Sequence, residues 1–442
     1  MLHSRKYLDI YLAGGSFFAY NNYLYIPGSD YSPGRLRSFD FPADPESGRR
    51  FLDNYNQTDK NAFVNLRATG PSVMLNVNRH SFAFQHNYRL VLSVDHLPFD
   101  AAKFMLEGLG YEPQQNIRFT NSNDITIGSL GWAEAGISYS YMLYRFNDVN
   151  ISAGITLKRL WAYHGLLLKS THADYMTPDS DTLIIYRLDA KGGFSLPVNY
   201  GNNEFQGFSD PFRGKGFAFD IGFSWVRTQE TQSTRVYRKL CEYPYEPYLY
   251  RIGLSFLDIG RIAFDQNRQT MVFSNIDTVW TGISSLTFES LDALLGEISA
   301  SLSGSPEALR SDEALRIALP SAISLQFDYN FNNNFIINTL VVQDLPLLNN
   351  RIARPSYISI SPRYSTRLYE VSLPFSLYRY REPRLGAAFR FMFLTVGTEN
   401  LGGFLGFSDF YGLDFYFAVQ IGLFKGNCGR RFGGIEQCPS FN

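Results

Sequence analysis

The stretch YGLDFYFAVQIGLF, residues 411–424, decides the fold class. Its odd positions are all apolar up to residue 423, whereas its even positions are mostly small or polar. Successive side chains of a β-strand point to opposite faces, so the stretch predicts a strand with one apolar face and one polar face.

The same two-residue period recurs along the chain. It is clearest in the segments 217–225, 315–331, 369–377 and 385–393, and it is noisier in several others between residues 7 and 364. These segments are about 9 to 15 residues long, which suits tilted membrane strands better than the five or six residues usual in soluble sheets.

The composition agrees with a barrel in a membrane. Aromatic residues make up 16% of the chain and charged residues only 18%, while the mean hydropathy is −0.16. Few charges and many aromatics with modest hydropathy are expected where only alternate residues face lipid. There is no run of about 18 apolar residues, which excludes a helical membrane span. The net charge of −1 gives no indication of nucleic-acid binding.

The connections between these segments fall into a short set and a long set, as in outer-membrane barrels. The short ones are rich in turn formers and lie at 78–79, 147–148, 332–334 and 365–366. The long ones are predicted to be extracellular and span 21–61, 95–124, 171–213 and 265–314. We therefore predict an all-β fold, an antiparallel transmembrane β-barrel of about 14 strands (range 12–16).

Residues 1–424 are predicted to form this single barrel, and 425–442 a periplasmic C-terminal tail. The last strand, 411–424, should pair with a first strand near 7–20 and close the wall. The segment 181–198 does not fit the in-and-out order of the strands. We expect it to pair with 164–175 as a ribbon that rises beyond the membrane.

Two segments, 98–109 and 286–302, carry apolar residues at helical spacing. We predict two short loop helices, which either pack over the barrel mouth or form a lid over a ligand.

Several passages resemble a family of outer-membrane barrels of the Bacteroidota that has no known function. That family is distantly similar to the long-chain fatty-acid transporter barrels and to the barrels of type IX secretion. The passages are HSFAFQ (80–85), LGWAEAGISYSY (130–141), ISAGITLKRL (151–160), GFAFDIGFSW (216–225), YRIGLSFLDIG (250–260), LPSAISLQFDYNF (319–331), GTENLGGFLGF (397–407) and GLDFYF (412–417). The resemblance implies the barrel architecture and transfers no catalytic residues.

Polar residues that alternate with the apolar ones are candidates to line the lumen, because a charge on the lipid face costs about 2–4 kcal/mol at mid-membrane. They are Lys158, Asp220, Arg316, Gln326, Asp328, Glu370, Arg390 and Asp414. Two interpretations stay open: salt bridges that fill a closed lumen, or a polar track for a solute.

Three cysteines support one hypothesis. Cys241 is predicted to lie beneath the barrel, on the same side as Cys428 and Cys438 in the tail. The periplasm is oxidising, so we expect a disulfide between Cys241 and Cys428, with Cys438 either free or in the place of Cys428. Unpaired thiols, or a local bridge between Cys428 and Cys438, are the alternatives.

The sequence shows no catalytic motif and no pairing of histidines typical of a metal site. We therefore expect no enzyme activity, no cofactor and no metal.

We predict an integral protein of the bacterial outer membrane, a passage for a small solute that could be hydrophobic. The alternatives are a non-transporting scaffold for secretion or surface proteins, and a soluble all-β binding protein. The expected partners are outer-membrane lipid and either a hydrophobic small molecule or periplasmic and surface proteins, with no nucleic acid. Export requires a signal peptide, and the first residues show none. We thus expect the printed chain to be a mature or shortened form, or one whose start is misassigned.

Overall fold

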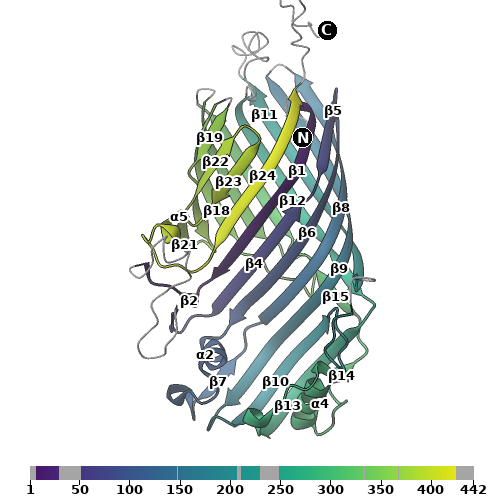
Figure 1. Cartoon of the computed structure of the whole chain (residues 1–442), viewed down its shortest axis with the longest axis vertical. Coiled ribbons are helices and arrows are strands. Elements are labelled where there is room, and N and C mark those ends of the chain that lie inside the picture. Colours follow the sequence, from purple (N-terminus) through teal and green to yellow (C-terminus); the bar gives the residue numbers. More distant parts are fainter. Residues whose placement is uncertain are drawn as a thin grey trace, which may run out of the picture.

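The computed structural model describes residues 6–28, 51–146, 148–206, 211–228, 248–331, 334–366 and 368–424. These residues form a closed antiparallel β-barrel whose wall has 14 strands (Figure 1). Several wall strands are interrupted and carry two labels. In wall order they are β1 (Lys6–Asn21), β4 (Lys60–Thr69) with β5 (Ser72–Val77), β6 (His80–Leu97), β8 (Ile125–Phe146), β9 (Val149–Met176), β11 (Gly214–Thr228), β12 (Tyr248–Phe264), β15 (Leu315–Ala318) with β16 (Ala322–Asn330), β17 (Phe335–Asp344), β18 (Tyr357–Ser365), β19 (Tyr369–Ser372) with β20 (Phe375–Tyr378), β21 (Glu382–Leu385) with β22 (Ala387–Phe391), β23 (Leu394–Thr398) and β24 (Asp414–Phe424).

The first and last strands close the wall, as the sequence predicted. β1 pairs antiparallel with β24, placing Phe17 opposite Phe415 and Ile10 opposite Ile421 (Figure 1). Because closure leaves no free edge, every wall strand has a partner on both sides.

The two ends of the barrel differ. At the end called here the turn end, where β1 begins and β24 ends in Figure 1, short connections join most of the neighbouring strands. One of them places Asn78 at φ 53° between β5 and β6, a left-handed conformation that asparagine tolerates. The opposite end, called the loop end, carries the long connections.

A cap extends the wall at the loop end (Figure 1). β9 continues past the wall and pairs there with β10 (Thr182–Ser195), which in turn pairs with β13 (Arg268–Thr281). This pairing of β9 with β10 confirms the predicted ribbon. The remaining cap elements are β7 (Arg118–Asn121), α2 (Phe99–Glu107), η2 (Glu112–Gln114), η3 (Ile283–Ser285), α4 (Leu291–Ser303) and β14 (Arg310–Ser311).

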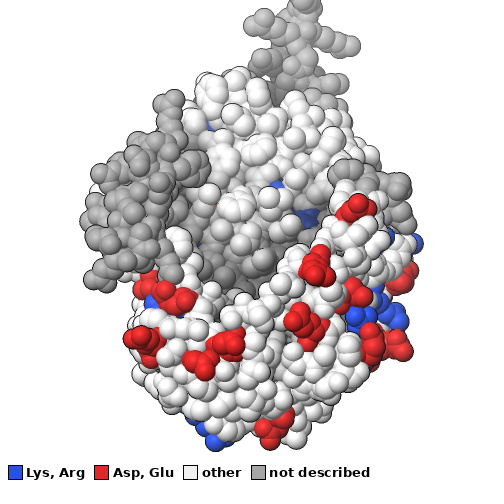
Figure 2. All heavy atoms as spheres, turned by 60° about the horizontal axis from the view of Figure 1, so that its bottom comes forward, with Lys and Arg blue, Asp and Glu red and all other residues white. Residues whose placement is uncertain are grey.

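Helices α2 and α4 are the two that the sequence predicted, with shorter bounds. α4 covers an apolar cluster of the cap that includes Met271, Leu302 and Leu309. Two further features of the loop end were not predicted: α5 (Leu401–Phe404), and the small sheet of β2 (Leu24–Tyr25) and β3 (Leu52–Asp53). Figure 2 shows the loop end as a hollow with acidic side chains spread along parts of its rim.

The outer face of the wall is apolar. Large side chains point outward from strands all around it, among them Phe82 (49% exposed), Ile137 (68%), Phe223 (48%), Phe375 (54%) and Phe415 (50%). Aromatic pairs gather near the turn end, such as Trp225 with Tyr250 and Tyr329 with Phe331.

The alternation between inward and outward side chains changes along one wall strand, the one formed by β15 and β16. Towards the turn end of β16, Leu325 and Phe327 are exposed, whereas on β15 the residues of the same parity, Leu315 and Ile317, are buried. The change falls at Pro320, which lies between β15 and β16. A proline cannot donate a ladder hydrogen bond, so it marks the point where the strand can change register. Arg316, predicted to line the lumen, therefore lies on the exposed outer face of β15.

Candidate functional site: an interior chamber beneath a plug

Two adjoining cavities occupy the barrel interior. The first has a volume of about 570 Å³ and is bounded by β1, β4, β5, β6, β8, β9, β11, β12, β24 and the connection that follows β17. The second, of about 430 Å³, is lined by β8, β9, β11, β12 and β16. Thr156, Asp220 and Leu257 line both cavities, which together are called here the chamber.

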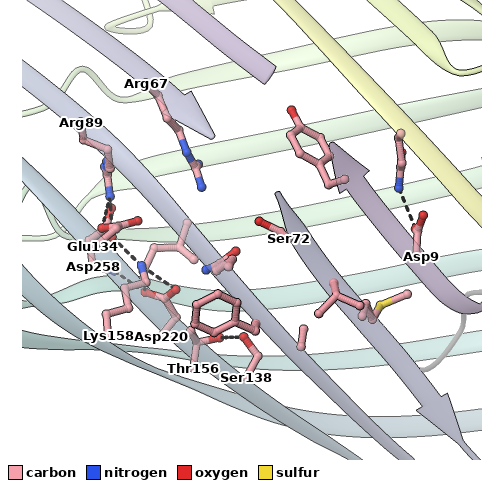
Figure 3. Close-up of a pocket in the computed structure, with 18 of the residues that line it drawn as sticks. Asp9, Arg67, Ser72, Arg89, Glu134, Ser138, Thr156, Lys158, Asp220 and Asp258 are labelled. Atoms are coloured by element: carbon pink, nitrogen blue, oxygen red, sulfur yellow. Dashed lines mark hydrogen bonds and ion pairs between the residues drawn. The ribbon is translucent and has the colours of Figure 1, made fainter. Parts of the chain in front are cut away.

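Five charged side chains form a cluster in the wall of the first cavity (Figure 3). This charge cluster consists of Arg89, Glu134, Lys158, Asp220 and Asp258. Lys158 Nζ lies 2.8 Å from Asp220 Oδ1 and 2.7 Å from Asp258 Oδ1. Arg89 donates to both carboxylate oxygens of Asp258, at 2.9 and 3.0 Å, and lies 3.5 Å from Glu134. The cluster thus joins five wall strands, β6, β8, β9, β11 and β12, on the interior side.

A β-bulge in β12 brings Asp258 into this cluster. Asp258 has φ 56°, and its backbone N–H donates to Asp220 Oδ1 at 2.8 Å. The pairing register between β11 and β12 shifts at the same level, between Phe219 and Ile221. A bulge inserts one residue and redirects the side chains that follow it. Asp258 consequently points inward, although Leu254 and Phe256, of the same parity, lie on the outer face of β12.

Arg67, on β4, faces the first cavity without a carboxylate partner. Its guanidinium donates to Asn87 Oδ1 at 3.2 and 3.1 Å, and its remaining donors point into open space (Figure 3). Arg354 lines the same cavity, and its Nη1 makes a long 3.5 Å contact to Pro320 O. Among the described residues, neither arginine forms an ion pair, so these two cations are available to a ligand.

The second cavity is lined by small residues. Serines and glycines from four neighbouring strands, β8, β9, β11 and β12, face it, and they leave space that larger side chains would fill. They are Ser140, Ser152, Gly154, Gly222, Ser224, Gly253 and Ser255.

An apolar layer separates the chamber from the loop end. It is a cluster of buried side chains that includes Leu130, Trp132, Leu160, Ile262 and Ile317, each with 0% exposure. Burying such side chains contributes about 1.5–3 kcal/mol each, so the layer is a stable packed element.

The connection 345–356, between β17 and β18, completes this layer and is called here the plug segment. Its Ile352 is fully buried and reaches Gly128 on β8, on nearly the opposite side of the wall. A Cβ added to Gly128 would lie 3.1 Å from Ile352 Cγ1 and 3.3 Å from Leu167 Cδ1. Because Gly128 has no side chain, it leaves the space that Ile352 occupies; this contact is called here the seat.

Further contacts hold the plug segment and the mouth. Ile352 N donates to Ala318 O at 3.3 Å, and Arg351 pairs with Asp344 at 2.7 Å. Across the mouth, Arg379 Nη1 lies 3.1 Å from Asp95 Oδ1.

The predicted lumen residues fall into separate groups. Lys158 and Asp220 come together in the charge cluster, and Glu370 pairs with Arg390 at 3.2 Å. Gln326 lines the second cavity. Asp328 is buried and accepts from Arg251 Nε at 2.8 Å, and Asp414 is buried and accepts from Glu399 N. Arg316 lies outside these groups, on the outer face.

Sequence reasoning missed Arg67, Arg89, Glu134, Asp258 and the plug segment as parts of the site. Arg89 had a signal, because Gln85, Asn87 and Arg89 alternate with Phe84, Tyr88 and Leu90. No sequence pattern indicated Asp258, because it continues the two-residue spacing of Leu254 and Phe256, which point outward.

Some predictions fall elsewhere. The disulfide predicted between Cys241 and Cys428, with Cys438 as the alternative, lies outside the described residues. Within the described residues, no group of three His, Cys, Asp or Glu side chains could hold a metal ion. No described helix is long and apolar enough to cross a membrane.

Residues 1–399 match the family DUF5723, a family of unknown function, and the chain belongs to it. No curated protein sequence matches the chain.

The solved structures that resemble the chain include the Pseudomonas putida toluene transporter TodX. It has 8% identity and a TM-score of 0.39, with 94% of this chain and 90% of that chain covered. A Pseudomonas aeruginosa FadL homologue has 10% identity and a TM-score of 0.29, with 93% and 89% covered. The Escherichia coli outer membrane protease OmpT has 7% identity and a TM-score of 0.22, with 93% and 94% covered.

Proposed function

We propose that this protein spans the bacterial outer membrane as a gated passage for a small polar solute, with the plug segment as the gate. The membrane placement rests on the outer face, where large apolar side chains are exposed on strands around the whole wall. A soluble all-β protein would bury such side chains.

One observation carries the passage: Ile352 is seated on Gly128 above a chamber whose first cavity alone has a volume of about 570 Å³. The chamber side of this contact is polar and spacious, whereas the contact itself is apolar and packed. Because the plug segment is a connection and not a wall strand, it can move without breaking the barrel.

The lining of the chamber indicates the class of solute. Charged and polar side chains outnumber apolar ones around the first cavity. Two of its cations, Arg67 and Arg354, have no carboxylate partner among the described residues, so a small solute with a carboxylate fits this lining better than a hydrophobic one.

A reversible lock tests the gate. The double variant Gly128→Cys with Ile352→Cys, in a background with serine at the three native cysteines, places two thiols at the seat. The short approach between these positions suits a disulfide. The oxidised protein in proteoliposomes should admit small polar solutes more slowly than the reduced protein, and a reductant should restore entry.

The control is Gly128→Cys alone, which should respond to neither oxidant nor reductant. Equal entry in the locked and reduced states would refute the gate. If a variant with Ile352→Ala and a shortened plug segment also admits no solute, the passage itself is refuted.

A second candidate function, a scaffold for surface proteins, is favoured by the cap. β9, β10, β13 and α4 form a packed platform beyond the wall, with an apolar cluster of its own. Partners that co-purify with the intact protein and are lost when 177–198 and 268–310 are replaced by short turns would support this function.

A further inference from the structure

Four cations gather on the outer face of the wall, at the border between the apolar face and the cap. They are called here the cationic patch and are Arg159 on β9, Lys215 on β11, Arg261 on β12 and Arg316 on β15. None of them belongs to the chamber or the plug.

The strand register brings these four side chains to one face. Phe217 lies opposite both Arg159 and Arg261, in one row across three strands. In the next row, Ala263 lies opposite both Lys215 and Arg316. Residues directly opposite, or two apart on one strand, share a face of the sheet. The four cations therefore occupy two adjacent rows of four neighbouring strands.

Their side chains point away from the interior. The residues between them, Leu160, Ile262 and Ile317, are fully buried in the apolar layer. Lys215, Arg261 and Arg316 are exposed, and the Arg159 guanidinium lies over the ring of Phe217, 4.2 Å from its centre.

Among the described residues, no carboxylate forms an ion pair with any of the four members of the patch. Cations without a nearby carboxylate attract an anion, and one arginine can donate two parallel hydrogen bonds to the oxygens of a phosphate.

The neighbours of the patch indicate where that anion comes from. Phe217 (68% exposed) lies within the patch, in the row of Arg159 and Arg261, and Leu157 (61%) lies one row further towards the turn end. Towards the loop end, the rings of Trp161 and Tyr163 lie 6.4 and 5.0 Å from that of Phe212. Aromatic rings beside an apolar surface are typical of the boundary between hydrocarbon and headgroups. The patch thus lies at headgroup level.

We propose that the cationic patch binds the phosphorylated headgroup of a lipid in the outer leaflet, whose acyl chains lie against Leu157 and Phe217. This inference rests on the membrane placement in the proposed function. It is independent of the gate.

Nanodiscs and native mass spectrometry test the inference. The full chain is placed in nanodiscs of phosphatidylcholine with and without lipid A, a lipid with two phosphates, and the lipid retained after release into detergent is counted. The variant R261Q/R316Q should retain about 25-fold less lipid A than the unchanged protein, because each of the two cations near an anionic lipid surface adds about a fivefold preference. R187Q/R268Q, with the same charge change in the cap, should retain the normal amount.

Each outcome decides one point. Failure to enter nanodiscs of either composition would refute the membrane placement. Normal entry with equal lipid A retention in the patch and cap variants would refute only the inference. Inorganic phosphate that displaces lipid A completely at millimolar concentration, or an acidic protein partner that binds the patch in detergent, would also overturn it. Single variants R261Q and R316Q serve if the double variant does not fold.

Discussion

Arg89 on β6 and Asp258 on β12 form a doubly hydrogen-bonded ion pair inside the barrel, at 2.9 and 3.0 Å. Both side chains are almost fully buried, at 10% and 7% exposure. The two strands are not neighbours in the wall, so this pair crosses the interior and does not follow the sheet. It is completed by Lys158, which also contacts Asp258.

Replacing Asp258 with alanine should destabilise the barrel strongly. Arg89 and Lys158 would lose their shared carboxylate while staying buried, and breaking a buried pair in this way costs about 3–5 kcal/mol. Urea unfolding of the barrel in lipid vesicles, followed by tryptophan fluorescence, measures this loss. Asp148→Ala, which removes the exposed pair with Arg227 at the turn end, is the control and should change little. Equal unfolding midpoints for the two variants would contradict the prediction.

Asp100 should give the cap a pH dependence. The side chain lies at the start of α2, where Tyr175 of β9 donates a hydrogen bond to it. Burial raises the pKa of the Asp100 carboxyl above its usual value, although the hydrogen bond from Tyr175 opposes this rise. A raised pKa in the folded cap means that the protonated form is preferred. Stability is then full below the unfolded pKa and is lost as the pH rises through the folded pKa.

Asp100→Asn should remove this dependence and protect the amides of α2 more strongly at pH 7, by a few-fold in hydrogen exchange.

Asp174 should give the cap the opposite pH dependence, because hydrogen bonds from Arg118 lower the pKa of its carboxyl. Its contribution is present at neutral pH and is lost as the pH falls through that lowered pKa. Asp174→Asn should therefore reduce protection of β7 at pH 7. Changes of the same sign in both variants would refute the assignment.

Arg67 should select for charge in the chamber. Its guanidinium is held by Asn87 alone, and the buried Asn65 Oδ1 beside it has no hydrogen-bond partner among the described residues. Arg67→Gln should weaken binding of benzoate by about 10- to 150-fold, because a charge-assisted hydrogen bond contributes about 1.5–3 kcal/mol. Binding of benzamide, a neutral molecule of similar shape, should stay within about twofold.

Equilibrium dialysis of the protein in detergent measures both probes. Arg268→Gln, on β13 in the cap, is the matched control and should leave both affinities unchanged. Equal losses for benzoate and benzamide would indicate a role of Arg67 in packing only.

The wall could be predicted from the sequence because its rule is local. One side of each strand faces an apolar surface, so the two-residue period is visible in residues 217–225 and 411–424. The closing pair of β1 and β24 and the ribbon of β9 and β10 followed from the order of the strands.

The chamber could not be predicted in the same way, because it depends on exceptions to that rule. The bulge at Asp258 and the break at Pro320 each reverse the faces of the residues that follow. Ile352 belongs to a connection without a period, and its partner Gly128 is defined by a missing side chain. Such contacts depend on the three-dimensional closure of the wall, which no local pattern encodes.

The reversed faces of β15 can be tested directly. In a background without native cysteines, Arg316→Cys should react with a membrane-impermeant maleimide in detergent at a rate close to that of Lys191→Cys, an exposed cap position. Ile317→Cys should react only after unfolding, because Ile317 has 0% exposure in the apolar layer. If the two-residue period of 315–331 continued without a break, the chamber side would instead hold residue 316 and the outer face residue 317. Rapid labelling at residue 317 with protection at residue 316 would then be observed, and the assignment of Arg316 to the cationic patch would fall with it.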